Sequence, residues 1–349
     1  MPRLRRVDCS GPGIARRRRG RGFEYLDGET EERIEEPEVI TRIKELAIPP
    51  AWVDVWICPF PMGHIQATGV DAAGRKQYVY HQKWREREDQ KKFDHMLDFA
   101  RVLPKMRWTW NKHLDTDHMS KDRVLACAAR LLDLGFFRIG TEGYAEQNQS
   151  YGLATIRKSH VTLEDGVITF DYRAKSGKRR IQQIVDPVVF EIVRELKRRR
   201  AGGPELLAYK DGSRWVDVRS PDINEYLKEL TGETFTAKDF RTWNATVLAA
   251  VSLVPFVGVR SKTARDRAIS QAVKDVARYL GNTPAVCRAS YVDPRVFDRF
   301  RSGWTIWPAL ENLGGGAAFG ELETQETVEE AVLDLIEDRR ESDALEKTA

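Results

Sequence analysis

The segment VTLEDGVITFDYRAKSGKRRIQQIV, residues 161–185, gives the clearest indication of fold class in this chain. Its polar and apolar residues alternate with the period of a β-strand, whereas the segments on both sides repeat their apolar residues with helical spacing. Asp165-Gly166 and Ser176-Gly177 each provide a two-residue turn of the kind that joins antiparallel strands. These residues therefore predict a three-stranded antiparallel sheet inside a mainly helical domain.

Helical patterns extend outward from this sheet in both directions. In SKDRVLACAARLLDLG, residues 120–135, Ser120 is a candidate N-cap, the apolar residues share one face, and Gly135 lies past the helix end. Helical spacing resumes at Pro187 and continues to about Asp298. We therefore predict one mainly helical domain over residues 91–320.

The preceding residues, 23–90, have a different pattern. A helical segment at 36–48 ends at PPAW, and WVDVWICPF, residues 52–60, alternates like a strand. Two further strand patterns flank the turn VDAAG at 70–74, and the charged run at 83–92 is a candidate linker or linking helix. The sequence thus predicts an α+β protein whose small N-terminal domain is mainly antiparallel β.

The two ends of the chain carry opposite charge. Residues 1–22 contain eight Arg and one Asp among Gly and Pro, which predicts a flexible basic arm able to pair with phosphates. Residues 321–349 contain eleven acidic and three basic residues, so the other 320 residues carry a net charge of +12. This acidic tail contains a candidate amphipathic helix, and two interpretations are open: disorder, or shielding of the basic surface. The basic body favours an anionic polymer, most simply nucleic acid, as the partner.

Composition narrows the class of protein further. A chain of 349 residues is long enough for two domains, and no run approaches the ~18–20 apolar residues of a membrane span. The four Cys are scattered without a CxxC pair and the six His lack ligand spacing, so we expect no metal site and a cytoplasmic location. A GxxxxGK[ST] phosphate-binding loop is also missing from the sequence, and we expect no cofactor.

Several residues of the helical half are candidates for chemistry, although each has an ordinary structural alternative. Arg138 follows GFF directly, where an ion-pair partner for nearby acids is the simpler interpretation. Lys175 precedes the Ser-Gly turn, and a lysine at a hairpin tip usually only improves solubility. Lys238 and Arg241 lie one turn apart at the start of an apolar helix, where they could bind an anion or pair with Asp239.

The segment GNTPAVCRASY, residues 281–291, adds two more candidates. Gly281 ends one helix, and Thr283-Pro284 is a good N-cap and first residue for the next. Asn282 lies in the corner between them, and Tyr291 follows about two turns later. In isolation Tyr291 would be interpreted as a packing residue.

Together these residue types fit the cleavage of a phosphodiester. A tyrosine can attack phosphorus, a lysine can protonate the leaving oxygen, and two arginines with an amide donor can bracket the non-bridging oxygens. Neighbouring guanidinium charge would also help a phenol, whose ordinary pKa is near ~10, to ionise. The set therefore predicts attack on nucleic acid by Tyr291.

At this point the chain resembles the type IB DNA topoisomerases of the small bacterial and poxvirus kind. The resemblance covers nearly the whole chain and rests on several long motifs in order: GRGFEYLDG, LAIPPAWVDVWICPFPMGHIQATGVDAAGRKQYVYHQKW, KFDHMLDFARVLP, the FRIG and YGLATI segments around Arg138, YRAKSGK, KDFRTW and LGNTPAVCRASYVDP. It implies relaxation of supercoiled duplex DNA without ATP or metal, by nicking, strand rotation and resealing.

The resemblance also implies roles for individual residues. Tyr291 would form a 3′-phosphotyrosyl link, Arg138 and Arg241 would contact the scissile phosphate, and Lys175 would be the general acid that expels the 5′-hydroxyl. Asn282 stands where the poxvirus enzymes carry a His, which implies an oxyanion donor that does not titrate. Further contacts with DNA are implied for Gln77, Tyr78, Tyr80, Tyr144 and Lys238.

Two other functions have to be weighed against this one. A tyrosine site-specific recombinase shares the catalytic set of Arg, Lys, Arg and Tyr. However, recombinases usually have a His-x-x-Arg box where this chain has KDFR, and their N-terminal domains are usually helical, whereas this one is predicted as strands. A non-enzymatic architectural DNA-binding protein would leave the five candidate catalytic residues unexplained. We therefore expect a monomeric, nucleoid-associated topoisomerase whose two domains clamp double-stranded DNA.

Overall fold

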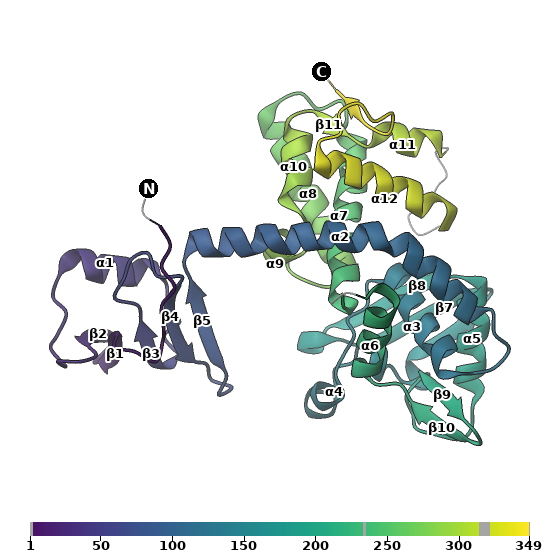
Figure 1. Ribbon diagram of the computed structural model, residues 1–349, viewed down its shortest axis with the longest axis horizontal. Coiled ribbons are helices and arrows are strands. Elements are labelled where there is room, and N and C mark those ends of the chain that lie inside the picture. The colour runs from purple at the N-terminus through teal and green to yellow at the C-terminus, as the bar shows by residue number, and fades with distance from the viewer. Residues whose placement is uncertain (1–2, 233–234, 314–321, 349) are drawn as a thin grey trace. The chain divides into compact units, whose positions relative to one another are not determined.

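A computed structural model describes residues 3–232, 235–313 and 322–348 (Figure 1). The chain divides into two compact units, Met1–Phe93 and Asp94–Ala349, and each is described by itself. Across the described residues, every helix is too short or too polar to span a membrane.

The first unit is built on an antiparallel sheet of five strands in the order β2-β1-β3-β4-β5 (Figure 1). Its elements are β1 (Ile14–Arg19), β2 (Gly22–Asp27), α1 (Pro37–Glu45), β3 (Val53–Ile57), β4 (Ile65–Val70) and β5 (Lys76–Tyr80). The predicted helix before PPAW and the predicted hairpin around residues 70–74 are confirmed, because α1 and the β4–β5 pair lie there.

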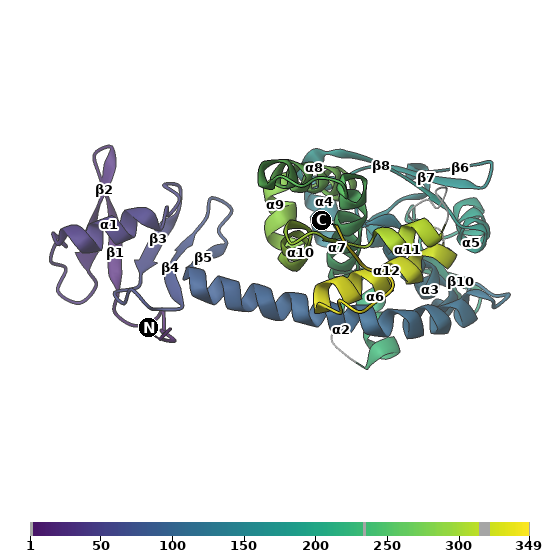
Figure 2. The same ribbon diagram turned by 90° about the horizontal axis from the view of Figure 1, so that it is seen from above.

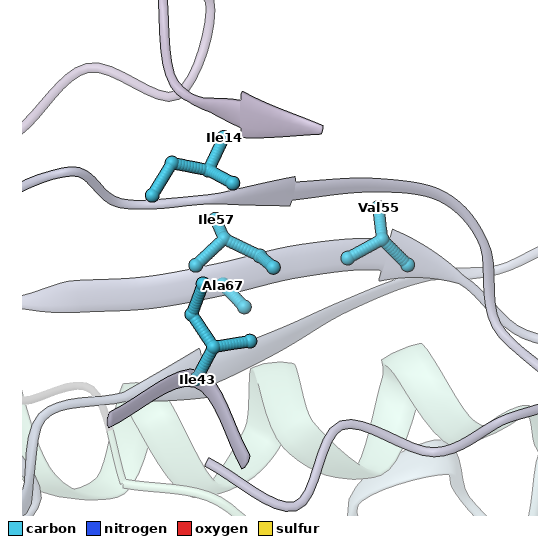
Figure 3. Close-up of a cluster of buried hydrophobic side chains, with 5 residues drawn as sticks. All are labelled: Ile14, Ile43, Val55, Ile57 and Ala67. Carbon is cyan, nitrogen blue, oxygen red and sulfur yellow. The ribbon is translucent and has the colours of Figure 1, made fainter. Parts of the chain in front are cut away.

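The core of this unit lies between α1 and the sheet. Ile43 of α1 packs against Ile14, Val55, Ile57 and Ala67, which come from three different strands (Figure 3). Alternation along each strand turns these residues to the same face of the sheet, which explains why the period-two pattern of the sequence was informative.

The prediction of a flexible arm over residues 1–22 is wrong for much of its length. Arg5 pairs with Gly63, and residues 14–19 form β1, paired with β2 on one side and β3 on the other. A run of arginines among glycines does not predict a strand, and one arginine of β1 has a structural role. Arg16 donates hydrogen bonds to the carbonyl oxygens of Ile48, Pro49 and Trp52, at distances of 2.7–3.3 Å.

The second unit is mainly helical, with a small sheet at one side. The long helix α2 (Gln82–Leu114) begins in the first unit and continues into the second. The further elements are α3 (Lys121–Gly135), α4 (Glu142–Asn148), β6 (Val161–Glu164), β7 (Val167–Arg173), β8 (Arg179–Val185), α5 (Pro187–Arg198), β9 (Ala208–Asp211), β10 (Arg214–Asp217), α6 (Ser220–Thr231), α7 (Ala237–Leu253), α8 (Lys262–Leu280), α9 (Pro284–Ser290), α10 (Pro294–Arg301), β11 (Trp304–Thr305), α11 (Trp307–Asn312), α12 (Leu322–Glu337) and β12 (Glu346–Lys347).

Helices α3 and α7 form the centre of this unit. Most residues of both helices are buried, and α7 contacts α3, α8, α10 and α12. A helix that is buried on nearly all sides needs neighbours on all sides, and the contacts of α7 supply them. Arg138 follows the end of α3 and Arg241 lies near the start of α7, and both line the same cavity.

The predicted three-stranded sheet is confirmed, in the order β6-β7-β8 (Figure 2). Asp165 and Gly166 form its first turn with positive φ angles of 47° and 79°, as a two-residue hairpin requires. The second connection is longer than predicted, because β7 ends at Arg173 and β8 begins at Arg179. The small hairpin of β9 and β10 was missed, since it lies within a region predicted as helical.

The prediction of a separate acidic tail over residues 321–349 is also wrong where the structure describes them. Helix α12 packs on α7, α10 and α11, and β12 pairs with β11. Arg107 of α2 forms bidentate ion pairs with Asp133 of α3 and Glu329 of α12, at nitrogen–oxygen distances of 2.7–2.9 Å. We call these three side chains the buried ion cluster. It joins the last long helix to the first two helices of the unit.

Candidate active site

Arg138 emerges from the end of α3 in a tightly fixed segment. The helix ends at Phe136, which has a left-handed conformation with a φ of 52°. The carbonyl oxygens of Arg138 and Ile139 then accept hydrogen bonds from the Leu153 and Ala154 amides, both at 2.8 Å. Gly152 allows this close approach, because a Cβ there would lie 2.6 Å from the Arg138 carbonyl oxygen. The FRIG and YGLATI segments are thus two sides of one packed support for Arg138.

Arg241 lies in the second turn of α7 and is 4% exposed. Two of its nitrogens donate to the carbonyl oxygens of Phe136 and Leu280, the latter at 3.1 Å, so it joins the ends of α3 and α8. Its third nitrogen, Nε, is buried and has no hydrogen-bond partner among the described residues. Burial, together with the charge of Arg138, lowers the pKa of Arg241 to about 10.

Asn282 occupies the corner between α8 and α9. Gly281 ends α8 in the left-handed conformation, with a φ of 64°, and Thr283 caps α9 by accepting from the Val286 amide at 3.3 Å. The Asn282 side-chain oxygen accepts a hydrogen bond from Arg138. Its amide nitrogen is buried and lacks an accepting atom among the residues that the structure describes. The predicted corner is therefore confirmed, and it leaves an amide donor available.

Tyr291 follows α9 directly, as its C-cap residue, instead of lying inside a helix. Its backbone amide donates to the Cys287 carbonyl at 3.0 Å, and its ring centroid lies 5.4 Å from the Arg241 guanidinium carbon. Burial alone would raise the pKa of the phenol, but the charges of Arg241 and Arg138 lower it below its ordinary value. The arrangement makes the phenol easier to ionise than an ordinary tyrosine.

Lys175 lies in the connection between β7 and β8, and its side chain is exposed. The connection closes through hydrogen bonds from the Ala174 amide to Lys178 at 2.7 Å and from the Gly177 amide back to Ala174 at 3.0 Å. Ser176 and Gly177 have positive φ angles of 63° and 70°. The tight loop therefore presents Lys175 on an exposed tip while its backbone is fixed.

The structure brings all five candidate catalytic residues together. A cavity of about 440 Å³ is lined by Arg138, Lys175, Arg241, Asn282 and Tyr291, and also by Lys238. The lining includes five cationic side chains and no carboxylate. Since buried donors without partners are rare, the free Arg241 Nε and Asn282 amide nitrogens indicate a site for an anion such as a phosphate. We call this cavity the catalytic cleft.

The other predicted DNA contacts lie elsewhere. Tyr78 and Tyr80 are exposed on one face of β5, with ring centroids 5.9 Å apart, whereas Gln77 is turned to the opposite face and donates to Asp71 at 2.9 Å. Tyr144 is exposed on α4 and does not line the catalytic cleft. Of these five residues, only Lys238 joins the catalytic group.

Sequence reasoning missed one cationic residue of the cleft lining and one cationic neighbour of the cleft. Lys178 lines the cavity, and Arg180 of β8 donates hydrogen bonds to the Arg278 and Tyr279 carbonyls at 3.2 and 2.5 Å. The run KRR, residues 178–180, could have indicated them, because three cations directly after the turn that carries a candidate general acid are more than solubility requires. Within the described residues, the structure brings together no cluster of three or more His, Cys, Asp and Glu side chains able to hold a metal ion.

Comparison with known proteins agrees with this geometry. Residues 81–301 match the family described as eukaryotic DNA topoisomerase I, catalytic core, and residues 22–71 match bacterial DNA topoisomerase IB, N-terminal domain. DNA topoisomerase 1B of Acanthamoeba polyphaga mimivirus is 34% identical over 290 residues, which cover 80% of this chain and 85% of that protein. DNA topoisomerase 1B of vaccinia virus (strain Copenhagen) is 20% identical over 242 residues, 66% of this chain and 70% of that protein. DNA topoisomerase 1 of Schizosaccharomyces pombe is 29% identical over 168 residues, 47% of this chain and 19% of that longer protein. The chain belongs to the type IB DNA topoisomerase family.

Proposed function

We propose that the catalytic cleft cleaves and reseals one strand of duplex DNA, with Tyr291 as the nucleophile. As a type IB topoisomerase, the protein relaxes supercoiled DNA. The observation that carries the residue assignment is the convergence of five side chains from distant parts of the chain on one cationic cavity, where the pKa of Tyr291 is lowered.

In the cleavage step, the Tyr291 oxygen forms a bond to the scissile phosphorus while the bond from phosphorus to the 5′-oxygen breaks. The phenol loses its proton to solvent before attack, which the nearby cationic groups favour. Lys175 gives a proton to the departing 5′-oxygen, so that a 5′-hydroxyl leaves and a 3′-phosphotyrosine remains. Its exposed position on the β7–β8 loop allows it to reach a DNA strand lying in the cleft.

Charge that develops on the phosphoryl oxygens is stabilised by Arg138, Arg241 and Asn282. Arg241 is held by two carbonyl oxygens and keeps its Nε free, and Asn282 uses its oxygen for Arg138 and keeps its amide nitrogen free. Donors fixed in this way need no reorganisation when the phosphate arrives. The Asn282 amide supplies this donor at every pH, because it does not titrate.

Religation is the reverse of cleavage. The 5′-hydroxyl attacks the phosphotyrosine, Lys175 takes its proton, and Tyr291 leaves. Because the phosphotyrosine conserves the energy of the original phosphodiester, resealing requires no ATP. Rotation of the free strand between the two steps releases supercoils.

The remaining assignments concern DNA binding and the state of the protein in the cell. We assign Gln77, Tyr78 and Tyr80 of the first unit, and Tyr144 and Lys238 of the second, to contacts with DNA. Two exposed, neighbouring tyrosines on β5 are suited to such a surface, since aromatic faces are otherwise costly to expose. The proposed enzyme acts as a monomer that closes its two units around the duplex, in the nucleoid of the cytoplasm.

The test is a plasmid relaxation assay with Tyr291→Phe, in EDTA and without ATP. We expect the unsubstituted protein to relax the plasmid and to leave a covalent adduct on Tyr291 when denatured during the reaction. Tyr291→Phe should bind the same DNA but give neither relaxation nor adduct. Relaxation by Tyr291→Phe, or an adduct on a different tyrosine, would show that the assignment is wrong. Activity only on plasmids that carry a paired target site would favour the recombinase interpretation, which neither family match supports.

A further inference from the structure

The first unit contains a second concentration of positive charge, formed by the start of the chain and the start of α2. The N-terminal segment is fixed to the sheet because the Arg5 amide donates to the Met62 carbonyl at 2.8 Å and the His64 amide donates to the Arg5 carbonyl at 2.9 Å. The Val7 amide also donates to the His64 ring at 3.2 Å. These contacts hold the arginines near residue 5 beside the first turns of α2.

The result is a cavity of about 480 Å³ with six cationic side chains in its lining. We call it the cationic pocket; these side chains are Arg3, Arg5, Arg6, Lys83, Arg87 and Lys91. The three from α2 are spaced by four residues and therefore share one face of the helix. Trp84 and His64 also line the cavity, in edge-to-face contact with ring centroids 4.8 Å apart.

Most of these charges have no ion-pair partner in the part of the chain that the structure describes. The lining contains no Asp or Glu, and among the described residues only Lys91 of the six has an ion pair, with Glu88 at 2.7 Å. Arg5 stacks on the Phe60 ring at 3.8 Å, which orients its guanidinium without neutralising it. Like charges brought together without counter-charge destabilise a fold, so their convergence indicates an external anion.

We propose that the cationic pocket binds consecutive phosphates of a DNA strand, at a site separate from the catalytic cleft. The face of α2 from Lys83 to Lys91 extends about 12 Å along the helix, at about 1.5 Å per residue. A DNA strand presents one phosphate per about 3.4 Å of its axis, so this face matches several phosphates of a polymer better than one small anion. The proposal rests on the proposed function only in that DNA is the ligand.

The test compares two double variants in the Tyr291→Phe background, which removes chemistry from the measurement. Lys83→Gln with Arg87→Gln removes two of the three α2 cations of the pocket, and Arg18→Gln with Arg85→Gln removes the same charge from exposed arginines outside it. The affinity for a duplex is measured against salt concentration. Each lost phosphate contact should reduce the slope of log K against log salt by about 0.9, so we expect a change of about 1.8 for the pocket pair and less than half of that for the control pair.

Equal changes for the two pairs, or no change for the pocket pair, would overturn the proposal, provided that thermal unfolding shows both variants folded. Calorimetric titration with ATP tests the alternative that the pocket binds the phosphates of a free nucleotide instead of those of DNA. Tight ATP binding that the pocket pair abolishes, without a change in the DNA slope, would assign the pocket to a free nucleotide and contradict the proposal. Failure of the Tyr291 assignment would leave this result unaffected, because no step of the assay requires cleavage.

A second inference rests on a different observation, the contact between the β7–β8 hairpin and the end of α8. Arg180 lies five residues after Lys175 and donates to two carbonyl oxygens in the last turn of α8, those of Arg278 and Tyr279. A cation is favourable there because of the helix dipole. Gly281 packs against the same guanidinium, since a Cβ on Gly281 would lie 3.0 Å from it.

The geometry points to Arg180 as a positioning residue that holds the Lys175 loop beside the Asn282 corner. The test is single-turnover cleavage by Arg180→Ala of ordinary DNA and of DNA with sulfur in place of the 5′-bridging oxygen. A thiolate is a good leaving group and requires no proton from Lys175. Since general acids contribute about 10²–10⁴-fold, we expect roughly 10- to 100-fold slower cleavage of ordinary DNA, and a rate within about threefold of normal on the sulfur DNA.

A second measurement excludes a merely structural effect. If Arg180 acts through Lys175, adding Arg180→Ala to Lys175→Ala should not slow cleavage further. Equal slowing on both DNAs, or a further loss in the double variant, would overturn the assignment.

Discussion

Replacement of Arg241 by Lys tests the design of the catalytic cleft most directly. Arg241 uses two nitrogens to hold the carbonyls of Phe136 and Leu280 and keeps Nε free for a ligand. A lysine has one nitrogen at the end of a flexible chain, so it cannot hold two carbonyls and a phosphate together. Burial would also lower its pKa, and part of the charge would be lost near neutral pH.

The expected magnitude follows from the loss of one fixed donor to the transition state. Such a loss costs about 2.7–4 kcal/mol, or about 10²–10³ in rate. Cleavage and religation pass through the same transition state, so both should slow by a similar factor while the fraction of covalent complex at equilibrium stays near normal. The assay is single-turnover cleavage of a nicked duplex, followed by religation started with an added 5′-hydroxyl strand.

Arg288→Lys is the matched control, because Arg288 lies on α9 three residues before Tyr291 but outside the cleft lining. It should cleave at nearly the normal rate. The reasoning is refuted if Arg241→Lys stays within tenfold of the unsubstituted protein, or if it slows cleavage alone. Thermal unfolding of each variant shows whether a slow rate reflects lost structure.

Three other substitutions test separate parts of the structure. Arg138→Gln removes a cation that lowers the pKa of Tyr291, so the acid limb of the cleavage rate should move to higher pH; an unmoved limb in the pH profile would contradict this. Arg107→Met leaves two buried carboxylates without their cationic partner and should cost about 3–5 kcal/mol in denaturant unfolding at pH 7. Because burial raises the pKa of Glu329, its carboxyl group costs the fold least when it is protonated, so that loss should shrink as pH falls, and a constant loss would refute the account. Gly152→Ala should cost about 1–3 kcal/mol and slow cleavage through the Arg138 support, whereas Gly143→Ala, where a Cβ meets nothing within 4 Å, should change neither unfolding nor cleavage.

The sequence was informative where local chemistry determines local structure. The alternation in residues 161–185 and the Gly-Asn-Thr-Pro corner predicted the catalytic sheet and the α8–α9 turn, because each depends on neighbouring residues alone. The convergence of Arg138 and Tyr291 on one cleft could be predicted only through family resemblance, since no local pattern relates positions so far apart.

Charge patterns were the main source of error. The arginine run in β1 was interpreted as part of a flexible basic arm, but Arg16 is used to satisfy backbone carbonyls of a distant loop. The acidic C-terminal segment was interpreted as a tail that is either disordered or shields the basic surface, but Glu329 is 6% exposed and paired with Arg107. Net charge cannot show whether a charged side chain has a partner, because that partner is supplied by the tertiary fold.

The buried ion cluster also has a consequence for the order in which the protein can form. Glu329 lies 222 residues after Arg107, and α12 covers surfaces of helices that are translated long before it. A ribosome delivers the chain from its N-terminus, so Arg107 and Asp133 are translated long before the third member of the cluster. The catalytic unit therefore completes its core only after α12 has been made, and a chain terminated before α12 carries every candidate catalytic residue but lacks the carboxylate that closes the cluster.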